Sequence, residues 1–513
     1  MNISHKICKS ALLYGALFFT VAISYSQNSV LELLPGSERL EFDEQTGIHR
    51  LYGNVNFKYQ GNLMFCDSAH YHQKRDVVYA YGKVHINKRD TLNLFCDSLF
   101  YNGKSRMAKL WGNVRVRDNE YKLTTDTLEY DARKGQAFYR YGGKVESIVS
   151  QEKLTSKVGY FYPETKDFYF SKDVTYRSDD ISMDTDTLQY FYSQKKTFFH
   201  GPTTIRSNDT KMYCENGWFN TATEEGSLRK NAWISRPGEY ISGDTLNYFP
   251  KQGISIGKGN VVYIDSAKNL SFTGNNAFVS DSLQYSFITG RAIASKEMNN
   301  DTIHVHADTL YNYKVDSVNI MKAYNNAKIY STSFQAKADS IVFNDSLNNI
   351  HLIHDPIVWS NGAELKGDLM TIQLKDSVVE TVNIFENSSI LMEVTAEMYY
   401  NQIAGQNIKA IFTDNKLTRA NVMGNAMTVS FPEDKESTDS TEVIKRMGMN
   451  RLYASDLRID LDSNEITGIS YIEKPDGVFY PMDQLNKDEQ FVPGFMWKAA
   501  LRPQSRQDLI RED

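Results

Sequence analysis

A unit of about 30 residues repeats along most of this chain, and the repeat limits the possible folds more than any other feature. One copy, from Gly112 to Tyr130, reads Gly-Asn-Val, a polar turn and then Asp-Thr-Leu-Glu-Tyr. An acidic marker recurs at Asp67, Asp97, Asp126, Asp186, Asp244, Asp308, Asp339, Asp368, Glu397 and Asp456. The 389 residues from position 67 to position 456, taken as thirteen steps, give a period of about 30 and about fourteen units. The chain is therefore predicted to form one elongated repeat structure.

The composition of the unit predicts antiparallel β-strands. Aromatic residues make up 12% of the chain, with 32 Tyr and 27 Phe but only 11 Pro. In the central copy, two β-rich runs are separated by the turn sequence Asp131–Gly135. Each unit is therefore expected to be an out-and-back pair of strands, and the whole an all-β antiparallel meander.

Each predicted strand carries a marker near its middle, Asp in one strand and Gly in the next. Mid-strand glycine marks bends, and bends aligned from strand to strand would crease the sheet into a trough. Because side chains two apart share a face, Asp126, Leu128 and Tyr130 are predicted to lie on one apolar face. The sequence leaves open whether this face is a filled core or an open groove.

The first 26 residues are predicted to be a secretory signal peptide cleaved near Ser26/Gln27. Lys6 and Lys9 precede an apolar stretch, and no later stretch approaches the roughly 18 apolar residues that a membrane helix needs. The chain is expected to be exported. Its net charge of −6 gives no electrostatic basis for nucleic-acid binding.

Three cysteines follow the signal peptide, Cys66, Cys96 and Cys214, each followed directly by Asp or Glu. An odd number argues against a disulfide scaffold in an exported protein, so they are expected to be small buried residues at one position of the repeat.

No residue pattern indicates catalysis, a cofactor or a metal. His304 and His306 share a face and precede Asp308, but two histidines without further ligands nearby favour an ordinary strand surface over a metal site. Nucleophile and phosphate-binding motifs are missing from the sequence. The protein is not expected to be an enzyme.

The chain is predicted to divide into a signal peptide (1–26), a repetitive segment (27–405), a C-terminal β segment (406–485) and a tail (486–513). Within the third part, the segment near 433–450 is charged and poor in apolar residues, so it is expected to be a mobile loop. The aromatic residues of the tail, Phe491, Phe495 and Trp497, are expected to cap the open end of the sheet.

The repeated motifs resemble those of the OstA/LptA family of lipopolysaccharide-transport proteins. They are GNV at 53–55, 112–114 and 259–261, GNA at 424–426, ADTLYNY at 307–313 and AKADSIVF at 336–343. The segments 408–429, 448–461 and 466–481 are similar to the longer OstA-like proteins of Bacteroidetes-type bacteria, and the resemblance covers about residues 30 to 480. The resemblance implies a creased β-jelly roll, also called a β-taco.

The resemblance also implies a function. Proteins of this family form a periplasmic bridge that shelters lipopolysaccharide acyl chains, so the implied partners are lipid A, inner-membrane Lpt transporter components and the outer-membrane Lpt translocon, with end-to-end self-association as a further option. The alternative is a structural or adhesive exported β-repeat protein whose apolar face is merely core. By pattern, the groove-facing residues would be Val55, Val84, Leu99, Tyr101, Val114, Leu128, Tyr130, Leu188, Tyr190, Leu246, Tyr248, Val261 and Leu310.

Overall fold

The structure is a computed structural model that describes residues 32–59, 62–88, 92–162, 164–297, 301–316, 318–344, 349–375, 378–414, 416–438, 441–462 and 465–511. The predicted signal peptide lies outside these residues. Contacts divide the chain into two compact units, Met1–Asn119 and Glu120–Asp513, which are described separately below. This boundary falls inside the segment 27–405, and the division of the chain by repeat type stays a prediction.

Unit 1 is an antiparallel sheet in which β1 and β2 both pair with β3, and β3 to β7 pair in chain order. Its strands are β1 (Glu32–Leu34), β2 (Arg39–Asp43), β3 (Ile48–Tyr59), β4 (Asn62–His72), β5 (Val77–Lys88), β6 (Leu92–Asn102) and β7 (Met107–Arg117).

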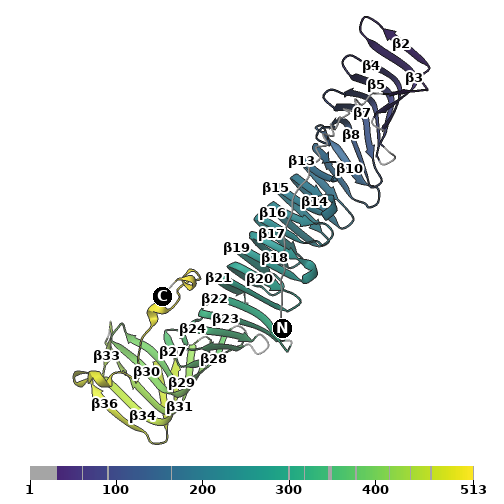
Figure 1. Cartoon of the computed structure of the whole chain (residues 1–513). Helices are drawn as coiled ribbons and strands as arrows, with labels where there is room; N and C mark the ends of the chain where they lie inside the picture. The colour runs from purple at the N-terminus through teal and green to yellow at the C-terminus, as the bar shows by residue number, and fades with distance from the viewer. Residues whose placement is uncertain are drawn as a thin grey trace, which may run out of the picture. The chain divides into compact units, whose positions relative to one another are not determined.

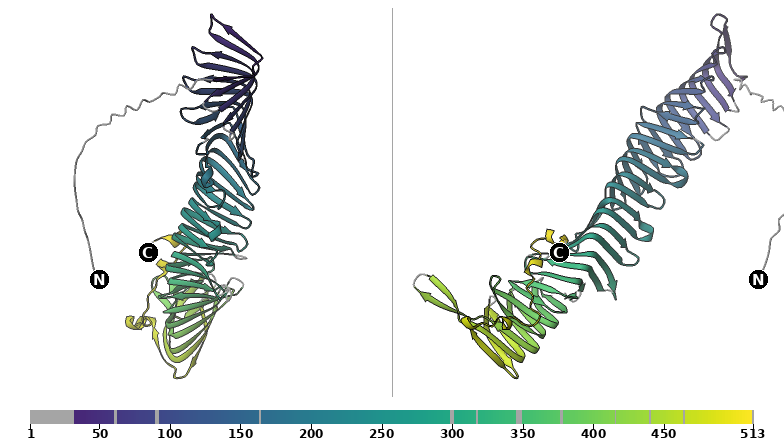
Figure 2. Two further views of the ribbon diagram at one scale, coloured as in Figure 1. Left: turned by 45° about the vertical axis from the view of Figure 1, so that its right-hand side comes forward. Right: turned by 60° about the vertical axis from the view of Figure 1, so that its left-hand side comes forward.

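Unit 2 continues the same out-and-back pattern, with successive strands lying side by side (Figures 1 and 2). Its strands are β8 (Tyr121–Asp131), β9 (Gln136–Tyr139), β10 (Gly143–Ser147), β11 (Lys153–Ser156), β12 (Val158–Tyr162), β13 (Asp167–Arg177), β14 (Ile181–Phe191), β15 (Lys196–Ser207), β16 (Thr210–Asn220), β17 (Gly226–Arg236), β18 (Glu239–Phe249), β19 (Ile254–Asp265), β20 (Leu270–Ser280), β21 (Tyr285–Glu297), β22 (Thr302–Val315), β23 (Val318–Tyr330), β24 (Gln335–Asn344), β25 (Asn349–Ile353), β26 (Ile357–Ser360), β27 (Ala363–Lys366), β28 (Leu369–Lys375), β29 (Val378–Thr395), β30 (Tyr399–Thr413), β31 (Lys416–Ser430), β32 (Glu433–Thr438), β33 (Thr441–Arg446), β34 (Gly448–Asp462), β35 (Glu465–Ile472) and β36 (Asp476–Pro481). The predicted all-β antiparallel jelly roll is confirmed.

Helices contribute little to the described part of the chain. They are the short 3-10 helices η1 (Tyr192–Gln194), η2 (Pro250–Gln252), η3 (Met482–Gln484), η4 (Lys487–Glu489), η5 (Ala499–Leu501) and η6 (Gln507–Ile510). None of them has the length or the hydropathy of a membrane-spanning helix.

The long strands bend near their middle and contribute one half to each of two facing layers. Layer 1 contains the half of β22 before Asp308, and layer 2 contains the half after it. The halves of the other strands in unit 2 are assigned to the layer of the strand half with which they pair. The bends of alternate strands consist of two consecutive residues with positive φ. Such pairs include Gly112–Asn113, Lys230–Asn231, Gly259–Asn260, Asn325–Asn326 and Glu386–Asn387. The register of pairing shifts at the same places, as between Lys258 and Val261, so the crease predicted at the glycine position is confirmed there.

The acidic marker of one strand holds the bend of the next strand. Gly259 lies against Asp244, and Asn260 Nδ2 donates to both carboxylate oxygens of Asp244 at 3.2 and 3.4 Å. The same contact joins Asn113 to Asp97 at 2.8 Å. These acidic side chains are exposed at the crease, where each carboxylate accepts hydrogen bonds from a residue that needs a left-handed backbone.

The prediction that Asp126 shares the apolar face with Leu128 is wrong, because Asp126 is exposed whereas Leu128 is buried. The reason is a break in alternation at the crease. In β14, Thr185 and Leu188 are both buried, and the register of pairing shifts between Thr185 and Thr187. Counting by twos is therefore valid within each half of a strand but not through the bend.

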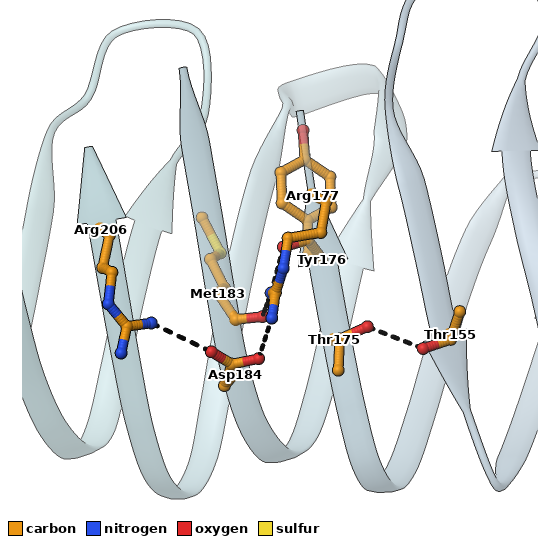
Figure 3. A network of polar contacts seen from close by, with 7 residues as sticks. All are labelled: Thr155, Thr175, Tyr176, Arg177, Met183, Asp184 and Arg206. Atoms are coloured by element: carbon orange, nitrogen blue, oxygen red, sulfur yellow. Dashed lines mark hydrogen bonds and ion pairs between the residues drawn. The ribbon is translucent and has the colours of Figure 1, made fainter. Parts of the chain in front are cut away.

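Outside the crease, each layer has an apolar inner side and a polar outer side. Figure 3 shows part of the outer side of layer 1, where Asp184 accepts from the guanidinium groups of Arg177 and Arg206. On neighbouring strands, the hydroxyl groups of Thr155 and Thr175 are hydrogen-bonded at 2.7 Å. The inner side contributes the buried apolar residues that form the core.

Cys66, Cys96 and Cys214 are free and buried, each immediately before an acidic crease residue, as the repeat predicted. Burial raises the pKa of each thiol to about 12. At pH 8 the reactive thiolate is therefore scarce in the folded state.

In a chain carrying Cys8→Ser, which removes a thiol outside the described residues, we expect maleimide to label none of the three buried cysteines in native buffer and all three in urea. Native labelling as fast as that of a free thiol would contradict this placement.

Two predictions for the C-terminal region are wrong. The charged segment near 433–450 is not a loop, because β32 and β33 pair with each other as a separate hairpin. In this hairpin Glu433 is opposite Arg446, and Thr438 is opposite Thr441. The tail does not cap the edge of the sheet but runs back over the outer side of layer 1, where Val492, Phe495 and Trp497 join a core cluster with outward side chains of β29, β31 and β34 (Figure 1). The edge formed by β35 and β36 exposes Ile472, Val478 and Phe479.

Candidate functional site

The two layers of unit 2 leave a cavity of about 370 Å³ between them, over the strands from β20 to β28. This volume lies in the range of about 300–1,000 Å³ that ligand pockets occupy. Most of the lining is apolar. Layer 1 contributes Leu270, Phe272, Ala294, Ile303 and Val305, and layer 2 contributes Met321, Phe343, Ile350 and Leu374.

Polar side chains surround the apolar lining at the free ends of the strands. On the layer 1 side they are Lys268 and Lys296, and on the layer 2 side Asn312, Asn319, Asn344 and Asn349. Lys268 forms an ion pair of 2.8 Å with the buried Asp265. The Oδ1 atom of Asn349 is buried and has no hydrogen-bond partner among the described residues. The cavity is therefore amphipathic, with an apolar floor and a rim that offers both cations and an unsatisfied acceptor.

The strands from β8 to β18 differ from this open section in that large side chains are buried between the layers and polar contacts close the mouth. Met183, Leu188, Phe199 and Phe219 are completely buried between the layers. Polar contacts also cross the mouth of the trough, from layer 1 to layer 2. Ser207 Oγ donates to Glu224 Oε2 at 2.9 Å, and the Arg236 guanidinium lies 5.7 Å from the centre of the Tyr248 ring. Unit 2 thus has a closed section followed along the chain by an open one.

The residues that the sequence pattern placed in the groove all occur on inner faces, but mostly at its base. Three of them, Tyr101, Tyr130 and Tyr248, are half-buried. The other ten are at most 5% exposed, namely Val55, Val84, Leu99, Val114, Leu128, Leu188, Tyr190, Leu246, Val261 and Leu310. Val261 and Leu310 belong to the core cluster beneath the cavity. A role for these residues in ligand contact stays a prediction.

The cavity-lining residues were missed because they lie nearer the strand ends than the motif does. Phe272 and Met321 lie outside the repeated motif that contains the Gly and Asp markers, and only their inward alternation distinguishes them. The width between the layers, which decides whether a side chain meets solvent or core, leaves no local signal in the sequence.

The two histidines considered as metal ligands take part in ordinary strand contacts. Nδ1 of His304 is 2.7 Å from Ser295 Oγ, and Nδ1 of His306 is 2.8 Å from the carbonyl oxygen of Ala292. Burial lowers the pKa of both imidazoles. Among the described residues, no group of three or more His, Cys, Asp or Glu side chains is arranged to hold a metal ion.

Comparison with protein families matches residues 33–186 to the family described as OstA-like protein. Residues 33–186 are an OstA-like segment. A solved structure that resembles part of the chain is the crystal structure of LptH, the LptA homologous periplasmic component of the conserved lipopolysaccharide transport device from Pseudomonas aeruginosa. The two share 13% identity over 31% of this chain and 85% of that chain, with a TM-score of 0.17. No curated protein matches the sequence.

The OstA-like segment contains unit 1 from residue 33 onward and the start of the closed section of unit 2. Seven of the pattern-predicted residues fall within it, from Val55 to Tyr130. The open cavity lies outside it, about 80 residues further along the chain. The two parts are nevertheless built from the same repeated strand pair, with the same acidic marker and the same bend.

Proposed function

We propose that this protein binds the acyl chains of lipopolysaccharide between its two layers and carries them across the periplasm from the inner to the outer membrane. The observation that carries the proposal is the apolar cavity with its polar rim in the open section. The OstA-like segment supports the lipopolysaccharide-transport class. The protein then acts as a binding surface and not as an enzyme.

The cavity suits an amphiphile on energetic grounds. Each acyl CH₂ group gains about 0.8 kcal/mol on leaving water, so an apolar floor holds a chain without specific contacts. Lys268 and Lys296 at the rim match the phosphates of a lipid headgroup, and the free Oδ1 of Asn349 accepts from a sugar hydroxyl or an amide N–H.

The proposed partners are the inner-membrane Lpt transporter components and the outer-membrane Lpt translocon, both of which carry like-folded jelly rolls. The edge formed by β35 and β36 is a suitable docking point because strand addition satisfies its backbone groups and covers Ile472 and Phe479. The same edge would serve end-to-end self-association. Periplasmic location rests on the predicted signal peptide.

A second candidate function, a structural β-repeat protein without lipid, is favoured by one observation. In the closed section, large side chains such as Phe199 and Phe219 are completely buried between the layers. If the open section were also filled by movement of its layers, the apolar face would only stabilise the fold.

In-cell photo-crosslinking distinguishes the two functions. A photo-reactive residue at Met321, which lines the cavity, is expected to form a lipopolysaccharide adduct. The matched control is Lys322, the next residue, which points to the outer side and lies against Tyr324. Adducts at 321 but not at 322 support the carrier. Adducts at neither position, in a folded and exported protein, overturn it and leave the structural function.

A further inference from the structure

At the start of unit 2, charged and aromatic residues from the two layers meet across the mouth of the trough. Lys166 Nζ lies 2.8 Å from Glu120 Oε2, and Lys195 Nζ lies 3.9 Å from Glu152 Oε1. Glu120 and Glu152 stand in turns at the free ends of layer 1, whereas Lys166 and Lys195 stand in turns at the free ends of layer 2. Both ion pairs therefore join the rims of opposite layers.

Aromatic rings reinforce these ion pairs just inside the mouth. The ring of Tyr121 in layer 1 lies 5.2 Å from Tyr192 and 5.8 Å from Phe168, both in layer 2. Lys195 Nζ also lies 4.0 Å from the centre of the Tyr192 ring. We call this group the clasp; it consists of Glu120, Tyr121, Glu152, Lys166, Tyr192 and Lys195.

The ion pair between Glu120 and Lys166 contributes little to holding the layers together. The side chains of Glu120 and Lys166 are 33% and 38% exposed, and ion pairs exposed to this degree contribute little to stability. The Lys166 ammonium lowers the pKa of the Glu120 carboxyl, which keeps the pair charged near neutral pH. Beneath the clasp the layers bury aromatic rings such as that of Tyr190 in layer 2, which is only 5% exposed. Once the rim contacts are released, the layers are held together by the burial of their apolar side chains. An acyl chain inserted between the layers buries the same apolar surface equally well.

We propose that the clasp is a gate: its two ion pairs and its tyrosine pair keep the trough shut over the closed section, and their release admits an acyl chain between the layers there. This inference rests on the proposed function, since it concerns how the same lipid moves. Lipid in the open section then stops at the closed section until the clasp opens. The units of the repeat are otherwise alike, so the gate is the position at which passage of the lipid along the trough is controlled.

The test breaks the clasp by charge reversal and reads the two sections separately. The variant E120K/E152K places like charges across the mouth, opposite Lys166 and Lys195. The fourfold variant E120K/E152K/K166E/K195E restores both pairs in the opposite sense. The matched control is K157E, which disrupts the ion pair between Lys157 and Asp173, two residues at the exposed crease. Photo-reactive residues at Tyr190 and Met321 report lipid in the closed and open sections.

We expect E120K/E152K to raise the lipid adduct at 190 several-fold while the adduct at 321 stays as in the wild type. The fourfold variant and K157E should both give the wild-type pattern. An adduct at 321 with none at 190 in any variant overturns the gate and makes the closed section a permanent core. Equal adducts at 190 in the wild type and in E120K/E152K overturn it too. Missing adducts at 321 count against the proposed function itself.

A lipid-independent measurement keeps the gate testable in that last case. The rate at which a water-soluble maleimide labels Tyr190→Cys reports opening of the mouth. We expect this rate to rise several-fold in E120K/E152K and to return in the fourfold variant. If the double reversal prevents folding, E120Q/E152Q removes the attraction without adding repulsion. Unchanged labelling in a folded clasp variant overturns the gate regardless of the lipid result.

Discussion

Replacing Gly259 by valine is expected to destabilise the bend of β19 by roughly 2–3 kcal/mol. Gly259 has φ +70°, where a side chain costs about 1–2 kcal/mol. A Cβ atom there would also lie 2.1 Å from Asp244 Oδ2. The carboxylate must then move away, which breaks its bonds to Asn260 at a further cost of about 1 kcal/mol. Hydrogen exchange measured on peptides from β18 and β19 is the appropriate readout, because a protein with two units has no single unfolding free energy.

Gly135 provides the matched control for this prediction. Its φ is +60°, but a Cβ atom there would meet nothing within 4 Å. Gly135→Val therefore incurs the backbone cost without the collision, and its local exchange should accelerate much less. Gly259→Asn should be intermediate, since Asn325 occupies the same position of another bend at φ +60°. Equal exchange in Gly259→Val and Gly135→Val would show that the contact with Asp244 does not hold the bend.

The bend also explains how far the sequence predicts this fold. The repeat of Gly and Asp markers predicts out-and-back strands and a crease, because both residue types have local reasons to occur there. Glycine is nevertheless not required. Lys230–Asn231 and Glu386–Asn387 form the same bend without it, so a search for glycine alone misses these positions. The prediction for Asp126 is wrong because the alternation of inner and outer side chains restarts at the crease, where strand pairing shifts its register, as it does in β14.

The functional features were harder to predict because they depend on residues distant in sequence. The cavity exists where the two layers stand apart, and the closed section exists where side chains such as Lys166 reach across to Glu120, 46 residues earlier. The position of the tail likewise depends on Gln402 and Glu364, which look like ordinary outward residues of their strands. Gln402 accepts from the Val492 N–H and donates to the Gln490 carbonyl oxygen. A pattern with a period of 30 residues contains none of this information.

The largest effect on stability is expected at Glu364. This residue is completely buried beneath the tail, with 0% exposure. Its carboxylate accepts from Trp359 Nε1 at 2.9 Å and from the backbone N–H of Lys498 at 3.0 Å, and it pairs with Lys366 Nζ at 2.7 Å. Burial lowers the pKa of Lys366, and the Glu364 carboxylate opposes that shift. The pair therefore depends on both partners being present.

Glu364→Ala leaves the Lys366 ammonium and two N–H donors buried without an acceptor, so we expect a loss of about 3–5 kcal/mol. Hydrogen exchange measured on peptides from β26, β27 and the tail should accelerate accordingly. The tail should also become sensitive to protease, because its backbone contact at Lys498 is lost. Glu364→Gln, which keeps an acceptor of the same shape, should lose less. Glu380→Ala removes a carboxylate that is 46% exposed and pairs with Lys375 only at 4.0 Å, so it should change neither property. If Glu364→Ala behaves like Glu380→Ala, the tail is not held on layer 1 by this buried carboxylate.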